Sequence, residues 1–303
     1  MKNPFLLLTF ASLFWAGNVV ISKALATDVP PISLAFMRWS LALFIVIIFS
    51  WKKVKQDICI IRKQLLVLLS ISFLGITAFN TMIYIALQDT TALNSLLLQS
   101  FLPVVVVLMS FAFFNEKLKK LQVVGILVSL LGTLTLVAKG SISTLAHTGL
   151  NRGDLWVIGA IVFYAGYTNL LRFRPQVHPL SFLATTFFLG VVMLLPFFLW
   201  EMSNTEPIVW NKDVFITVGY LGIFPSFVAY LFFNYGVSKV GGNIAGLFSH
   251  LIPLFGSLMA IFFLGETFYG YHAVGMLFTF SGIYLVIKDK IMLKPKSKRN
   301  KLV

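Results

Sequence analysis

The chain has 303 residues, of which 58% are hydrophobic, 15% are aromatic and only 11% are charged, and its formal net charge at pH 7 is +14. With a mean hydropathy of +0.91, this composition excludes an ordinary water-soluble domain and indicates a chain whose solvent is lipid. The positive charge then indicates a fixed orientation beside anionic headgroups, and not nucleic-acid binding.

Ten apolar stretches are long enough to cross a hydrocarbon core of roughly 30 Å as helices. The first could be mistaken for a signal peptide. It is long, however, lacks a small-residue cleavage pattern and resembles the start of the second half, so we expect it to be retained. The predicted helices are 4–23, 31–51, 65–87, 91–114, 121–138, 154–172, 180–200, 213–236, 242–264 and 270–287.

The second half of the chain repeats the first at an offset of 150 residues, the difference between Pro103 and Pro253. In the same register lie Met109 and Met259, Phe113 and Phe263, Glu116 and Glu266, Val124 and Val274, Gly125 and Gly275, Leu127 and Leu277, and Gly132 and Gly282. An offset shorter by one residue places FWAG at 14–17 over FYAG at 163–166. Because each half contains an odd number of helices, the halves must have opposite orientations, as in many secondary transporters.

We therefore predict an all-α integral membrane protein whose ten transmembrane helices form two inverted five-helix repeats. The predicted divisions are a first repeat over 1–139, an exterior linker over 140–153, a second repeat over 154–288 and a basic cytoplasmic tail over 289–303. With the N-terminus inside, 19 of the 24 Lys and Arg residues fall in cytoplasmic segments and four in exterior ones, while Arg38 lies within a helix. This bias predicts a multi-pass protein of the cytoplasmic (inner) membrane with both termini cytoplasmic.

Several motifs at these spacings resemble a known family. They are WAGN at 15–18 followed by Lys23, the segment P-x-x-L-A-F-x-R-W from Pro31 to Trp39, the prolines of the fourth and ninth helices, and the Glu-then-Gly pairs Glu116…Gly125 and Glu266…Gly275. Together they resemble the ten-helix EamA-type members of the drug/metabolite transporter superfamily, over nearly the whole chain. The resemblance implies a carrier in the cytoplasmic membrane for small organic metabolites, commonly an exporter of amino acids or related compounds.

Polar side chains are costly in lipid, so their positions indicate which helix faces point toward protein or water. Stripes at helical spacing occur on the first, third, fourth, sixth and eighth predicted helices. From them and from two ionisable residues we predict a substrate site made of Trp15, Asn18, Arg38, Asn80, Tyr84, Gln99, Tyr167, Tyr230 and His250. The alternative is that these residues only hydrogen-bond helix to helix for stability.

The two ionisable residues and two prolines have specific predicted roles. Arg38 lies within the second helix, where its donors suit a carboxylate or phosphate; the alternative is contact with headgroups or helix-end carbonyls. His250 could take up a proton and couple it to transport; the alternative is a neutral histidine that donates one bond to a neighbouring helix. Pro103 and Pro253 are predicted to bend their helices as paired hinges, with packing kinks as the alternative.

The positions of the acidic residues indicate the charge of the substrate. No Asp or Glu falls in the middle of a predicted helix. This favours a neutral, zwitterionic or anionic substrate over a lipophilic cation, which would need a buried carboxylate. Glu116 and Glu266 are each expected to cap the helix that follows, with gating as the alternative. Gly125 and Gly132 are expected to allow close approach of helices, as are their repeat partners.

An enzyme finds little support, because the four histidines lack the spacing of a catalytic or metal-ligand set and no phosphate-binding loop occurs. We predict no cofactor and no metal. The predicted function is a secondary transporter that moves small organic metabolites, with amino-acid-like compounds favoured, outward by alternating access. The alternatives are uptake, multidrug efflux of lipophilic cations, and a channel or passive receptor. Expected partners are the substrate, the lipid bilayer and a proton as coupling ion, in a monomer or homodimer.

Overall fold

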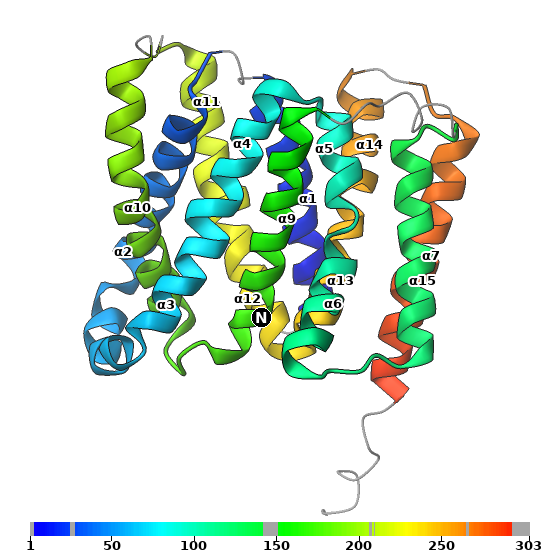
Figure 1. Ribbon diagram of the computed structural model, residues 1–303, viewed down its shortest axis with the longest axis horizontal. Coiled ribbons are helices and arrows are strands. Elements are labelled where there is room, and N and C mark those ends of the chain that lie inside the picture. Colours follow the sequence, from blue (N-terminus) through cyan, green and yellow to red (C-terminus); the bar gives the residue numbers. More distant parts are fainter. Residues whose placement is uncertain are drawn as a thin grey trace, which may run out of the picture.

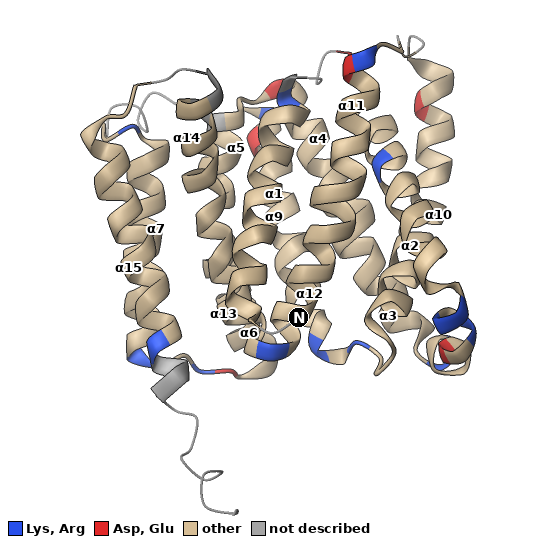
Figure 2. Ribbon diagram, turned by 180° about the vertical axis from the view of Figure 1, so that it is seen from behind, with Lys and Arg blue, Asp and Glu red and all other residues tan. Residues whose placement is uncertain are grey.

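The structure is a computed structural model that describes residues 3–24, 28–141, 151–205, 208, 210–264 and 267–292. Every regular element in these ranges is a helix. Ten of them, counting joined segments together, are long and apolar enough to cross a membrane. The prediction of an all-helical protein with ten membrane-spanning helices is therefore confirmed. The helices stand side by side in one bundle (Figure 1), and charged residues lie mainly at its two ends (Figure 2).

The observed bounds agree closely with the predicted ones, except that several helices are longer or divided. The second helix, for example, continues to Lys63 instead of residue 51, because residues 52–63 contain no glycine or proline to stop it. The helices are α1 (Pro4–Ala24), α2 (Pro31–Lys63), α3 (Leu65–Ser72), η1 (Phe73–Ala78), α4 (Phe79–Asp89), α5 (Ala92–Gln99), α6 (Leu102–Phe114), α7 (Lys120–Val137), α9 (Arg152–Leu170), η2 (Leu171–Phe173), α10 (Pro179–Asn204), α11 (Lys212–Leu221), η3 (Gly222–Val228), α12 (Ala229–Val240), α13 (Gly242–Leu247), η4 (Phe248–His250), α14 (Leu251–Leu264) and α15 (Gly270–Met292).

The third and eighth membrane helices each contain a π-helical segment near the middle, η1 and η3 respectively. Such segments interrupt the regular ladder of backbone hydrogen bonds and are frequent at functional sites. Carbonyls of both segments accept bonds from other helices. Trp15 Nε1 donates to the carbonyl of Pro225 at 3.0 Å, and Tyr230 Oη donates to the carbonyl of Gly75 at 2.5 Å.

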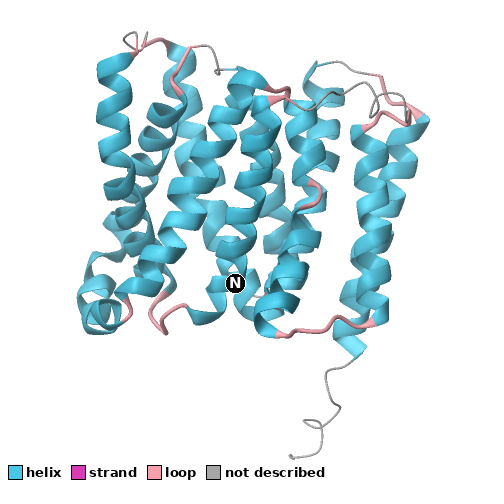
Figure 3. Ribbon diagram, in the orientation of Figure 1, coloured by secondary structure: helices cyan, strands magenta, loops and turns pink. Residues whose placement is uncertain are grey.

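The fourth and ninth membrane helices are interrupted near their prolines, where each was predicted to bend. α5 ends at Gln99 and α6 begins at Leu102, and the short loop between them is visible in Figure 3. Likewise α13 passes through the 3-10 segment η4 before α14 begins. Pro103 and Pro253 both lie in the first turn of the later segment, where a missing N–H costs nothing. Their role as hinges stays a prediction.

Helices α7 and α15 pack against each other at one edge of the bundle, and α2 packs against α10 at the other (Figure 1). At the first edge, glycines bring the two backbones together. A Cβ at Gly132 would lie 2.4 Å from the backbone N of Thr279, and one at Gly125 would lie 2.7 Å from the carbonyl O of Gly282. Neither position has room for a side chain, which confirms the predicted close approach.

Equivalent helices of the two halves make equivalent contacts. α4 packs on α9 as α12 packs on α1, and α6 packs on α9 as α14 packs on α1. The π segments and the interrupted helices also occur in pairs, one in each half. These observations support the predicted inverted repeat, which enters the mechanism proposed below.

Charged side chains fix several helix ends. Glu201, near the end of α10, accepts hydrogen bonds from the N–H groups of Ile32 and Ser33 at 3.1 and 2.6 Å, so it stabilises the N-terminus of α2. Lys23, near the end of α1, donates to the carbonyls of Leu87 and Thr90 at 2.8 and 3.0 Å and so stabilises the C-terminus of α4. These contacts connect the N-terminus of α2 to α10 and the C-terminus of α4 to α1.

Candidate substrate site

Arg38 lies at the centre of a buried polar cluster formed by α1, α2, α4 and η3. Its side chain is only 1% exposed. The Nε atom donates to Ser226 Oγ at 2.8 Å, and Nη1 donates to Asn18 Oδ1 at 3.0 Å and to Asn80 Oδ1 at 3.1 Å. Nη1 also donates to Tyr84 Oη. We call these five residues the Arg38 cluster.

All of these partners are neutral. Among the described residues no carboxylate forms an ion pair with Arg38, so its positive charge is met by amide and hydroxyl oxygens and by the rings of Trp39 and Tyr84, at 5.0 and 5.7 Å. A buried cation of this kind is costly unless a counter-charge reaches it. Its burial and its bonds to side chains disfavour the alternatives of headgroup and helix-end carbonyl contact, while its role in substrate binding stays a prediction. The cluster is therefore suited to receiving an anionic group.

Aromatic side chains cover one side of the Arg38 cluster. Tyr230 connects the two, since its Oη accepts from Asn80 Nδ2 at 3.3 Å. Trp15 meets the ring of Tyr230 edge-on with centroids 5.9 Å apart, and Tyr167 lies 5.8 Å from Tyr230 on another side. Tyr164 completes the group at 5.1 Å from Tyr167. Aromatic walls beside a cation suit a substrate with both an apolar and an anionic part.

Several buried polar atoms in this region have no hydrogen-bond partner in the described part of the chain. They include Trp39 Nε1, Tyr164 Oη and Asn234 Nδ2, from residues that are at most 4% exposed. Buried polar groups are rarely left unpaired unless a ligand or water serves them. The unpaired groups thus offer hydrogen bonds to a bound substrate close to the aromatic wall.

The structure brings together seven of the nine predicted site residues and leaves two elsewhere. Gln99 is separate and donates from Nε2 to Ser95 Oγ at 2.9 Å. His250 is fully buried, with Nδ1 lying 2.7 Å from Ser129 Oγ and Nε2 lying 2.8 Å from the carbonyl O of Ser100. Since a carbonyl only accepts, Nε2 carries a proton, which favours the alternative of a histidine bonded to a neighbouring helix. Proton coupling through His250 stays a prediction.

Sequence patterns missed two features of the site. Ser226 was visible in the polar stripe of the eighth helix but was not among the predicted site residues, although it binds Arg38 Nε. The π segments η1 and η3 carry no composition signal, apart from the unusual Pro225 within a helix. Both features depend on contacts between the two halves, which a pattern within one helix does not reveal.

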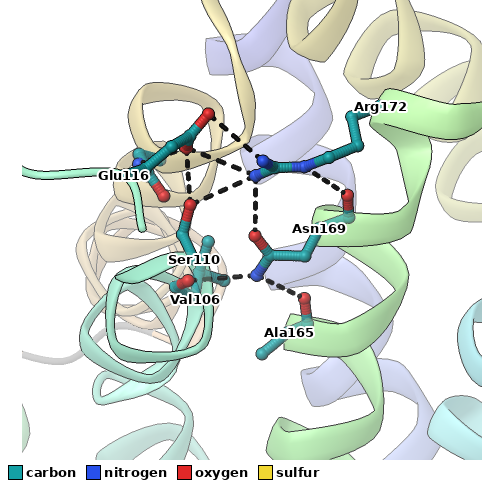
Figure 4. Close-up of polar contacts among 7 residues, drawn as sticks. Val106, Ser110, Glu116, Ala165, Asn169 and Arg172 are labelled. Carbon is teal, nitrogen blue, oxygen red and sulfur yellow. Dashed lines mark hydrogen bonds and ion pairs between the residues drawn. The ribbon is translucent and has the colours of Figure 1, made fainter. Parts of the chain in front are cut away.

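Glu116 does not cap the helix that follows it, so that prediction is wrong. Instead its carboxylate accepts from Arg172 Nη1 at 3.2 Å and Nη2 at 3.3 Å, from Ser110 Oγ at 2.5 Å and from Asn243 Nδ2 at 3.2 Å (Figure 4). Asn115, in the left-handed conformation with φ of 53°, ends α6 and turns the chain back toward Arg172. Glu116 thus links the two halves. Glu266, its repeat partner, lies outside the described residues.

A bundle of ten apolar helices around a buried polar cluster defines a multi-pass membrane protein. The profile of the EamA-like transporter family matches residues 3–138 and 151–288. The chain therefore belongs to the EamA-like transporter family, within the drug/metabolite transporter superfamily. Members of this family are transporters and not enzymes.

Individual relatives agree with this assignment. The chain is 25% identical over 290 residues to the uncharacterized transporter YyaM of Bacillus subtilis, covering 93% of this chain and 92% of that one. It is 28% identical over 287 residues to an uncharacterized transporter of Archaeoglobus fulgidus, covering 92% and 96% of the two chains. A solved crystal structure superposes with a TM-score of 0.77 at 19% identity, covering 96% of this chain and 98% of that one, which shows a shared fold.

Proposed function

We propose that the protein is a secondary transporter for small organic metabolites that carry a carboxylate, and that the Arg38 cluster binds this group. The observation that carries the proposal is the buried guanidinium with neutral partners only. A carboxylate would supply the missing counter-charge and could form two parallel hydrogen bonds with the guanidinium. Membership of a transporter family supports the transport activity itself.

The aromatic residues favour a substrate with an apolar side chain, such as an amino acid or a related compound. Trp15, Tyr164, Tyr167 and Tyr230 surround one side of the cluster, so an apolar side chain could lie against their rings while the carboxylate faces Arg38. Lipophilic cations are disfavoured, because a buried Arg38 would repel them and no carboxylate in the described residues pairs with it.

Alternating access is the proposed mechanism. In inverted repeats the two halves can exchange conformations, so that one side opens as the other closes. The paired interruptions of the fourth and ninth helices and the paired π segments supply equivalent bending points in each half. We place the protein in the cytoplasmic membrane, with the N-terminal end of α1 and the C-terminal end of α15 on the cytoplasmic side. The basic residues are concentrated in the segments that this orientation makes cytoplasmic. Export is the proposed direction, with uptake as the alternative.

The experiment that tests this function combines binding with flux. Purified protein is screened by thermal shift against amino acids, their deaminated and decarboxylated derivatives, nucleotide-like metabolites and lipophilic cations. A ligand at 100 times its dissociation constant should raise the stability by about 2.7 kcal/mol. Stabilising compounds are then tested for counterflow in proteoliposomes, which a channel or passive receptor does not show. Stabilisation by lipophilic cations alone would overturn the carboxylate assignment and point to multidrug efflux.

A further inference from the structure

A cavity lies at the end of the bundle that carries the N-terminal end of α1. Its volume is about 980 Å³, and it lies between the α6–α7 connection of the first half and the ends of α9, α12 and α13 in the second. Its lining includes Glu116, Lys117, Arg172, Arg174 and Lys239. We call it the basic vestibule, because these are four cationic side chains and one carboxylate.

Arg174 is the one half-buried cation among these four, since the other three are exposed. It donates from Nη1 to the backbone carbonyl of Asn234 at 3.0 Å, and no ion pair to it occurs within the described ranges. Burial lowers the pKa of its guanidinium below the ordinary value, so water has been partly removed from this charge without a carboxylate to replace it. A half-buried cation in a cavity attracts a small anion.

Arg172 already holds a carboxylate, that of Glu116. The hydrogen bond from Ser110 and then the charge of Arg172 hold the pKa of Glu116 below its ordinary value, although partial burial acts in the other direction. The pair is not sealed from water, since the two side chains are 28% and 49% exposed. An anion that enters the vestibule can therefore compete with Glu116 for the same guanidinium.

Two buried polar atoms in the lining have no hydrogen-bond partner in the described part of the chain. Thr168 is only 2% exposed, and its hydroxyl has no hydrogen-bond partner in the described part of the chain. Asn243 Oδ1 is also unpaired there, while its Nδ2 binds Glu116. Unpaired buried groups beside an excess of positive charge indicate a polar ligand.

A chain of contacts connects the vestibule to the Arg38 cluster. Asn234, whose carbonyl holds Arg174, accepts from Tyr167 Oη through its Oδ1 at 2.5 Å. Tyr167 lies against Tyr230, which binds Asn80 of the cluster. Side-chain contacts therefore link the vestibule to the Arg38 cluster.

We propose that the basic vestibule is a second binding site, for a small molecule with a carboxylate, in which Arg174 and Arg172 hold the carboxylate and Glu116 is displaced from Arg172. The choice of a substrate-like molecule rests on the proposed function. Displacement of Glu116 loosens a contact between the two halves, so occupancy of the vestibule favours separation of the halves at this end. A lipid headgroup has the same oxyanion chemistry and is distinguished by the experiment.

The experiment follows binding directly, without transport. In a Cys59→Ser background, which removes the sole cysteine, Gln176→Cys places a fluorophore at the vestibule lining. The labelled protein is titrated with phenylacetate at constant ionic strength, with 2-phenylethanol as the uncharged control. The titrations are made in nanodiscs of phosphatidylcholine and again with phosphatidylglycerol added.

We expect a saturable response to phenylacetate and none to 2-phenylethanol. Arg174→Gln should weaken phenylacetate binding about tenfold, as expected for the loss of one charge-assisted hydrogen bond, whereas Glu116→Gln should tighten it. Lys52→Gln removes an exposed charge outside the lining and should leave binding unchanged. If Arg174→Gln does not fold, Lys117→Gln, at an exposed lining position, should still weaken binding about twofold.

Arg38→Gln keeps the two proposals separate. A vestibule response that persists in this variant supports the second site whatever happens to transport. Equal weakening by Arg174→Gln and Lys52→Gln would mean that the basic residues act only through diffuse charge, and would overturn the proposal. A signal that follows phosphatidylglycerol and ignores phenylacetate would assign the vestibule to headgroups and overturn it as well.

Discussion

Replacement of Arg38 by glutamine should strongly weaken binding of a carboxylated substrate while leaving most of the fold's stability intact. The prediction follows from the cluster itself. Arg38 is buried and makes four hydrogen bonds, all to neutral oxygens. A residue placed there only for stability would normally be neutral or paired with a carboxylate.

The magnitudes come from two opposing effects in the protein without substrate. A hydrogen bond from a charged donor contributes about 1.5–3 kcal/mol, so four such bonds contribute about 6–12 kcal/mol at most. Against this gain, burying the guanidinium away from water costs several kcal/mol, and no opposite charge offsets that cost. Glutamine keeps one or two of the bonds and carries no charge, so the net change in unfolding free energy should be below about 3 kcal/mol.

The effect on the substrate complex should be larger. Loss of one partner of a buried charge pair costs about 2–5 kcal/mol, which weakens binding by about 30-fold or more. The assay compares melting temperatures with and without a saturating carboxylated ligand, and then flux in proteoliposomes. Arg62→Gln is the matched control, because it removes the same group from an exposed position on the same helix.

Two results would refute this reasoning. Normal transport in Arg38→Gln would show that the guanidinium does not hold the substrate. A large loss of stability with an unchanged ligand-induced shift would show that the cluster is a structural hydrogen-bond network, which was the alternative for every polar stripe in the sequence.

Three further perturbations test other parts of the structure. Gly132→Leu should separate α7 from α15 and lower the unfolding free energy by at least about 2 kcal/mol, whereas Leu131→Ala at an exposed neighbouring position should have little effect; equal melting temperatures would contradict the close approach. Glu201→Gln should cost about 1–2 kcal/mol by weakening the cap of α2, measured by denaturation in detergent. The lowered pKa of Glu116 means that its ionised form stabilises the fold above its ordinary pKa of 4.5 and that this contribution disappears as the pH falls through the folded value. The stabilities of wild type and Glu116→Gln should therefore begin to converge as the pH falls below 4.5 and should meet below the folded pKa; parallel curves would exclude this role.

Composition and periodicity predicted most of the fold, because lipid imposes strong rules on segment length and polarity. They also predicted one site containing Asn18, Asn80 and Tyr84, which lie on polar faces of otherwise apolar helices, and Arg38, a charged residue within a membrane helix. Glu116 was different. Its sequence position before a helix suggested a cap, whereas its partner Arg172 is 56 residues away, and no local pattern could identify that pairing.

The sequence also did not reveal the irregular backbone in the middle of several helices. This irregular backbone supplies hydrogen-bond acceptors to side chains in and near the candidate site. A carbonyl inside a regular α-helix already accepts one backbone hydrogen bond, whereas a π segment or an interruption can leave a carbonyl without that bond and ready to accept one from another helix. The π segments supply the carbonyls of Gly75 and Pro225 to Tyr230 and Trp15, and the interruption after α5 supplies the carbonyl of Ser100 to His250. Each of these bonds joins one half of the chain to the other. Bending at these interruptions would therefore alter the contacts between the halves directly. The proposed alternating access needs such coupled changes, because the regular helical segments on either side of each interruption move as rigid bodies.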